Sequence, residues 1–156
     1  MQVVGVLAVL AVALYLVPTG AHLFELPAKM AMDRADYMIV QQIYRGWALF
    51  GAAVFAGMLL TLLYAILRRH MRGPAVLSLA AFLCLLATQV VFWVFTYPVN
   101  VASQNWTLAP EPFEAARRQW EYSHAASAGL TALALLAITT AVALDREAHL
   151  RQRAAA

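Results

Sequence analysis

Charged residues are scarce in this chain. Only 12% of its 156 residues are Asp, Glu, Lys or Arg, and 63% are hydrophobic. A soluble domain carries about a quarter charged residues, so the composition argues against a water-soluble globular fold. There is one cysteine, Cys84, which excludes an intrachain disulfide, and we expect it to pack as a small apolar residue. The net charge of +3 comes from arginines at the ends of apolar runs and does not indicate nucleic-acid binding.

The apolar residues form four long runs, at 3–21, 47–67, 76–96 and 125–144. Each is close to the roughly 20 residues that a membrane-spanning helix needs. The chain therefore predicts an all-α, polytopic membrane protein: one domain over residues 1–156, folded as an antiparallel four-transmembrane-helix bundle. We place the spans at about 3–25, 40–67, 75–97 and 115–144. The first run lacks a basic start and a cleavage site, so we interpret it as a retained helix.

Arginines set the predicted orientation. They cluster in the link "RRHMRGP" (68–74), where we expect a tight turn at Gly73–Pro74, and in the tail "DREAHLRQR" (145–153). By the positive-inside rule both segments and both termini face the cytoplasm. We expect a multi-pass protein of a bacterial inner membrane. Its longer loops lie on the periplasmic side, which is where a functional site is expected.

Two pairs of ionisable residues stand near the predicted outer ends of spans one and four. His22 and Glu25 are three residues apart, as are Glu121 and His124, so each pair shares one helical face. The helices are antiparallel, and therefore the histidines should lie at one depth and the glutamates one layer further out, with the first helix ending at Pro27. Two histidines and two carboxylates suit iron, copper, zinc or manganese. We predict a single metal centre with the ligands His22, Glu25, Glu121 and His124, because spans two and three offer no carboxylate for a bridged pair.

Several alternatives stay open. The four residues could form a functional pocket without metal, or pair structurally with Arg45 or Arg117 at a wet interface. His22 and His124 at matched depth would also suit the axial positions of a b-type haem. A non-catalytic accessory or assembly subunit of a larger membrane complex, or a homo-oligomer, is compatible with the same sequence.

Further polar residues point toward the same level of the bundle. In "QQIYRGW", Gln41, Tyr44 and Arg45 recur at helical spacing, with Tyr37 two turns earlier, and Asn100 follows the third span. Trp106 and Trp120 suit the aromatic belt at the interface. We assign catalytic roles to Glu25, Glu121, Arg45 and Asn100, and cofactor or substrate binding to Tyr44, Gln41 and Trp120. Arg45 would neutralise the carboxylates or hold an anionic or phenolate substrate.

Three segments resemble the small four-helix membrane proteins grouped with anthrone oxygenases. They are "GAHLFELP" (20–27), "YPVNVASQNW" (97–106) and "ARRQWEYSHAASAGL" (116–130), whose matching residues are Asn100, Trp106, Arg117, Trp120 and His124. The resemblance implies the four-helix fold and an oxygenation of an activated aromatic, anthrone to anthraquinone, without a flavin. A glutamate or histidine would act as the base. Either the substrate carbanion meets O₂ directly, or bound iron or copper activates O₂. The lipophilic substrate would enter laterally from the membrane lipids.

Overall fold

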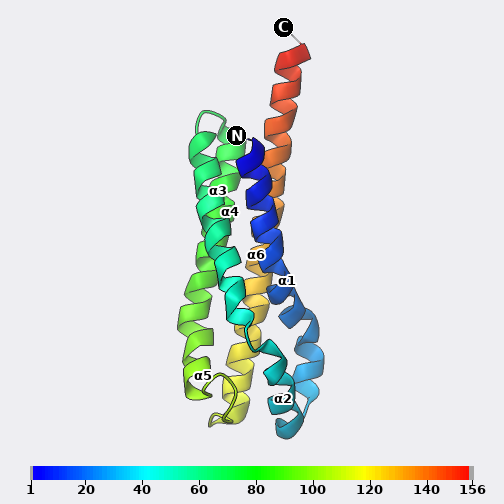
Figure 1. The fold of residues 1–156 in the computed structure, drawn as a ribbon, viewed down its shortest axis with the longest axis vertical. Helices are drawn as coiled ribbons and strands as arrows, with labels where there is room; N and C mark the ends of the chain where they lie inside the picture. Colours follow the sequence, from blue (N-terminus) through cyan, green and yellow to red (C-terminus); the bar gives the residue numbers. More distant parts are fainter. Residues whose placement is uncertain (1, 155–156) are drawn as a thin grey trace.

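Four long helices form an antiparallel bundle (Figure 1). The structure, a computed structural model, describes residues 2–154. The bundle helices are α1 (Gln2–Ala31), α3 (Gly51–Leu67), α4 (Arg72–Val91) and α6 (Phe113–Ala154). Shorter pieces gather at the end of the bundle opposite both chain ends: α2 (Arg34–Val40), η1 (Gln41–Tyr44), η2 (Trp47–Phe50), the π-helix η3 (Phe92–Thr96) and α5 (Tyr97–Ala102). The all-α four-helix architecture expected from the sequence is confirmed.

The helices are long and apolar enough to cross a membrane. The four candidate spans run over Gln2–Ala31, Trp47–Leu67, Arg72–Ala102 and Phe113–Ala148. Large apolar side chains on all four spans point outward, among them Val17, Leu59, Val90 and Leu136. Such an outer surface is stable in lipid and would be costly in water. The protein is therefore a multi-pass membrane bundle.

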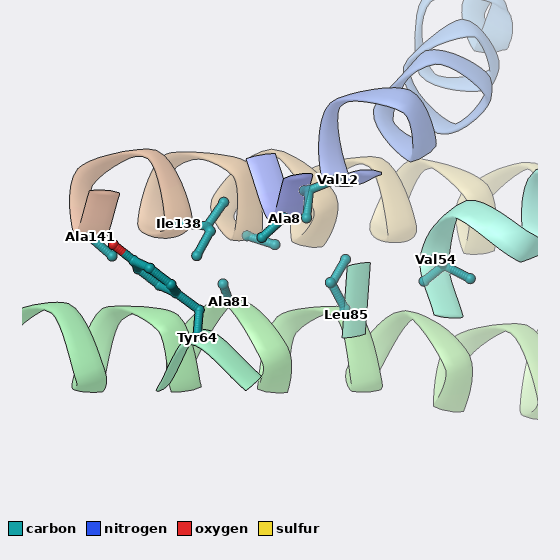
Figure 2. Close-up of a cluster of buried hydrophobic side chains, with 9 residues drawn as sticks. Ala8, Val12, Val54, Tyr64, Ala81, Leu85, Ile138 and Ala141 are labelled. Carbon is teal, nitrogen blue, oxygen red and sulfur yellow. The ribbon is translucent and has the colours of Figure 1, made fainter. Parts of the chain in front are cut away.

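Small residues let the four helices approach closely. The buried cluster contains four alanines, Ala8, Ala81, Ala134 and Ala141, beside a few larger side chains. In Figure 2 side chains from α1, α3, α4 and α6 meet along the bundle axis. Gly5 shows how tight the contact is: a Cβ there would stand 2.8 Å from Val142 Cγ2 and 3.0 Å from the Tyr64 ring. Close approach of this kind is the usual basis of helix association in membranes.

Helix α1 extends past its predicted end. It contains Pro18 and Pro27 and continues to Ala31, so the expected stop at Pro27 is wrong. A proline removes one backbone hydrogen bond and bends a helix, but neighbouring helices can hold the remaining turns. Here the last turns are anchored from α6: Lys29 binds Glu121, and Arg117 Nη1 donates to the Met32 carbonyl at 2.8 Å. The four residues beyond Pro27 therefore belong to the bundle.

The second span is broken, although the sequence predicts one helix over 40–67. After α2, whose N-terminus is capped by Asp33, the chain passes through η1 and η2 and becomes regular only at Gly51. Between η1 and η2 Gly46 has φ +86°, a left-handed conformation that glycine adopts without a steric cost. The break displaces the chain sideways, so that this segment forms one wall of the cavity described below.

The third and fourth helices also differ from their predicted bounds. The turn between α3 and α4 is formed by 68–71, and Gly73 and Pro74 lie in the first turn of α4. Proline is tolerated there because the first amides of a helix have no intrahelical partner. The third span continues through the π-helix η3 and α5 to Ala102. Single π-turns inserted in a helix are often found at functional sites.

Candidate functional site

A cavity of about 690 Å³ occupies the end of the bundle opposite the chain ends. Its walls come from α1, the broken second span, α4 with η3 and α5, and α6. Aromatic side chains dominate the lining: Tyr15, Tyr44, Trp47, Phe50, Phe55, Phe92, Trp93, Tyr97, Trp106 and Trp120. Phe55, Trp93 and Tyr97 line the cavity and are also exposed on the outer surface. The cavity therefore reaches the lipid-facing surface between α3 and the η3–α5 segment.

Two histidines meet at one wall of the cavity. His22 from α1 and His124 from α6 both line it, and their ring centroids are 4.2 Å apart. The predicted match in depth between the two helices is confirmed by this contact. The ring of His22 also faces Tyr44 at 4.5 Å, Trp120 at 5.0 Å and Trp47 at 5.5 Å. His22 is thus enclosed by aromatic rings.

The hydrogen bonds of the two imidazoles are unequal. His124 Nδ1 lies 2.9 Å from the Trp120 carbonyl, and because a carbonyl only accepts, Nδ1 carries the proton. In the neutral ring Nε2 then keeps its lone pair. His22 is buried, and its Nδ1 has no hydrogen-bond partner among the described residues. The pair therefore offers lone-pair or donor capacity that the described protein atoms leave unused.

Glu25 is linked to the cavity through Tyr44. The Tyr44 hydroxyl donates a hydrogen bond to Glu25 Oε2, and the Tyr44 ring lies against His22. Burial of the phenol, together with the neighbouring carboxylate, raises the pKa of Tyr44 above its ordinary value. Tyr44 therefore remains a hydrogen-bond donor at neutral pH. Since Glu25 is only half-buried, the pair connects the cavity wall to the outside of the bundle.

Glu121 has a different partner. It is fully buried and forms an ion pair with Lys29 of α1, Nζ to Oε1 at 2.6 Å. Its Oε1 also accepts from the Tyr37 hydroxyl at 2.7 Å, and Gln41 Nε2 approaches that hydroxyl at 2.5 Å. Burial and the adjacent Glu121 carboxylate raise the pKa of Tyr37 above its ordinary value. The network joins α1, α2, η1 and α6 directly behind the cavity.

Trp120 connects this network to the cavity. Lys29 Nζ stands 4.6 Å from the ring centroids of both Trp120 and Tyr44, a cation–π geometry. On its other side Trp120 packs edge-on against Trp106 at 5.7 Å and donates from Nε1 to Asn100 Oδ1 at 2.8 Å. Trp106 and Trp120 are both buried, so their predicted place in an interfacial belt is wrong. Asn100 accepts the indole N–H of Trp120, whereas Trp106 is held by ring contacts and its buried indole N–H has no hydrogen-bond partner among the described residues.

The loop that carries Trp106 has an unusual backbone. Gln104, Asn105 and Trp106 have φ of +48°, +55° and +63°, a left-handed run without glycine. Such residues persist only where neighbours hold them. Ser103 Oγ accepts from the Trp106 amide at 3.0 Å, and Gln42 Nε2 donates to the Trp106 carbonyl at 2.7 Å. The strain places Trp106 and Asn105 in the cavity wall.

The predicted site residues lie in the cavity wall, beside it or behind it. The cavity wall contains His22, Gln41, Tyr44, Arg45, Asn100, Trp120 and His124, with Arg45 exposed. Glu25 is attached to it through Tyr44, and Glu121 is held by Lys29 and Tyr37 behind it. Arg117 pairs with Glu114 at 2.6 Å and covers the Tyr37 ring, away from the histidines.

The predicted four-ligand metal centre is not assembled. Among the side chains that the structure describes, no group of three or more His, Cys, Asp or Glu lies close enough to hold a metal ion. The two histidines are together, whereas each carboxylate has another partner. Two imidazoles on opposite sides of a haem iron would have ring centroids roughly 6 Å apart, given metal–nitrogen bonds of about 2 Å. Haem binding would thus require the two rings to separate.

The contacts of Lys29 with Glu121, Trp120 and Tyr44 were not predicted from the sequence. A signal was present: Lys29 is four residues after Glu25 and seven after His22, so all three share one helical face. Because the helix was predicted to stop at Pro27, Lys29 was not placed on this face.

Comparisons of the chain with protein-family models, curated proteins and solved structures found no match.

Proposed function

We propose that this protein is a membrane oxidoreductase of the oxygenase type, which binds a lipophilic aromatic molecule in the cavity between α1, α3, η3 and α6. The observation that carries the proposal is the cavity itself: about 690 Å³, walled by aromatic rings, with two histidines on one side. Ligand sites are typically concave and apolar with a few convergent polar groups, and cavities of 300–1,000 Å³ hold a small molecule.

The position of the cavity suits a substrate dissolved in the bilayer. Phe55, Trp93 and Tyr97 border it on the lipid-facing surface, so a flat apolar molecule could enter between them without crossing water. Aromatic walls favour aromatic ligands through offset and edge-on ring contacts. By the positive-inside rule this end of the bundle faces the periplasm of a bacterial inner membrane.

His124 is the residue best prepared to act as a base. The Trp120 carbonyl fixes its proton on Nδ1, leaving Nε2 to take a proton from a ligand in the cavity. The Tyr44 hydroxyl keeps its proton and donates it in a hydrogen bond to Glu25, so it would donate a hydrogen bond to a ligand oxygen by turning from Glu25 to the ligand. Both groups suit a substrate whose C–H is acidified by an adjacent carbonyl, such as anthrone, because the developing enolate needs a base and a donor.

The reaction balances with O₂ as the only co-reactant. The methylene carbon of anthrone loses both hydrogens and gains one oxygen atom as a carbonyl. The second oxygen atom leaves with those hydrogens as water. The four electrons lost by the carbon reduce O₂, so no further reductant is required.

The experiment is an anthrone oxidation assay with the protein in lipid nanodiscs, following anthraquinone absorbance and O₂ uptake above empty-nanodisc background. We expect His124→Gln to lower the protein-dependent rate at least tenfold, since a general base contributes about 10²- to 10⁴-fold. His70 is exposed in the turn at the far end of the bundle, so His70→Gln is the matched control and should retain the rate. A wild-type rate equal to background, or an unchanged rate in His124→Gln, would contradict the proposal.

A further inference from the structure

We infer that His22 and His124 form a binding site for one divalent first-row transition ion at the cavity wall. This inference concerns the cavity of the proposed function and rests on that function only for the use of the ion, not for its binding. It replaces the four-ligand centre predicted from the sequence, because the carboxylates of that centre are engaged elsewhere.

The separation of the rings fits two ligands of one ion. Metal–nitrogen bonds of about 2 Å place the centroids of two imidazoles roughly 4.5 Å apart when the ligands meet at a right angle, and roughly 5 Å apart at a tetrahedral angle. The observed separation is 4.2 Å. It therefore suits neighbouring positions of a square-planar or octahedral ion, the geometries of copper(II) and iron(II).

The hydrogen bonds are those of a metal-binding histidine. Imidazole ligands usually donate their other N–H to a carboxylate or a backbone carbonyl, which fixes the tautomer. His124 donates from Nδ1 to the Trp120 carbonyl at 2.9 Å, so Nε2 is the ligand atom, and the general-base role proposed above belongs to the protein without a bound ion. His22 is buried with Nδ1 unpartnered among the described residues, a cost that an ion or its bound water would remove.

The charges near the site are close to balanced. Lys29 is near both histidines, but it forms an ion pair with Glu121. Glu25 forms none of the ion pairs of the described residues and is bound by the Tyr44 hydroxyl. The Tyr44 ring lies 4.5 Å from the His22 ring, and the Tyr44 hydroxyl binds Glu25, so Tyr44 separates this carboxylate from the two histidines. Arg45 lines the same cavity but is exposed, so solvent screens its charge. The remaining coordination positions would face the open cavity.

The test is copper(II) binding to the full-length protein in nanodiscs, freed of any histidine tag. The chain has four histidines, and a His70→Asn/His149→Asn background leaves only His22 and His124. Equilibrium dialysis gives the stoichiometry, and pulsed electron paramagnetic resonance counts the bound imidazoles. We expect one copper per chain with two imidazoles. His22→Ala or His124→Ala should leave one imidazole and bind copper at least tenfold more weakly. Thr140→Ala, whose side chain is exposed on α6 and does not line the cavity, should leave the site unchanged.

A wild-type site with no imidazole or only one would overturn the inference, whether or not the histidine variants fold. Loss of copper binding with retained anthrone oxidation would refute the metal site and leave the proposed function standing. Copper bound by two imidazoles without any oxidation would establish the site and refute the proposed function.

Discussion

The buried Lys29–Glu121 ion pair should be a principal stabilising contact between α1 and α6. Both side chains are almost fully buried, at 1% and 0% exposure, and their charged atoms are 2.6 Å apart. Removing one partner of such a pair leaves an uncompensated buried charge and costs about 3–5 kcal/mol. Lys29→Met should therefore lower the free energy of unfolding by that amount. Glu121→Gln should do the same, because Lys29 would lose its ion pair and keep only the Gln41 Oε1 contact at 3.5 Å and its cation–π contacts with the aromatic rings.

The double variant Lys29→Met/Glu121→Gln separates charge from packing. With both charges removed, the loss should be at least about 2 kcal/mol smaller than the sum of the single losses, since neither charge is left unpaired. Reversible unfolding in mixed detergent micelles, followed by tryptophan fluorescence, measures all three. The exposed pair Arg34–Glu111, whose charged atoms are 2.7 Å apart, is the control, and Arg34→Gln should cause a much smaller loss at neutral pH than either buried variant. Single losses below about 1 kcal/mol, or additive losses, would refute the reasoning.

Three further predictions concern backbone and surface. Gly5→Ala should cost about 1–3 kcal/mol of unfolding free energy through overpacking, whereas Gly129→Ala, with open space around its Cβ, should not destabilise; chemical denaturation compares them. Gly46→Ala should cost about 1 kcal/mol because φ +86° is strained for alanine, and an unchanged midpoint would contradict this. Arg34 holds the pKa of Glu111 below its ordinary 4.5. The contribution of this pair to the free energy of unfolding is therefore present above about pH 4.5 and is lost as the pH falls further. Arg34→Gln should flatten this acid dependence in a pH titration of the melting temperature.

The bundle could be predicted because its causes are local. Long apolar runs leave the backbone no alternative to helix within lipid, and arginines at span ends set the arrangement of the loops. The meeting of His22 with His124 followed from counting turns on two antiparallel helices. These relations depend on spacing alone, so the sequence carries them.

The features that could not be predicted depend on which of several possible partners a side chain binds. Glu121 could bind a metal or a cation, and the choice was decided by Lys29, which reaches it only because α1 continues beyond Pro27. The helix break at Gly46 and the π-helix η3 depend on how the helices pack around the cavity. The local sequence does not predict either feature reliably. Trp106 and Trp120 are residue types typical of an interfacial belt, but both are buried: Trp120 donates a hydrogen bond to Asn100, and the two indoles pack edge-on.

The central claim is that the cavity beside His22 and His124 binds one lipophilic aromatic molecule per chain, and saturable binding tests it most directly. Gly51 lines the cavity and has open space at its Cβ, so Gly51→Phe should occupy part of the cavity and hinder binding of a flat aromatic molecule. Gly129→Phe, outside the cavity and equally unobstructed, is the matched control. With radiolabelled anthrone in nanodiscs under nitrogen, we expect one molecule bound per wild-type or Gly129→Phe chain and at least tenfold weaker binding to Gly51→Phe. Non-saturable partitioning that is equal in all three proteins would contradict the claim.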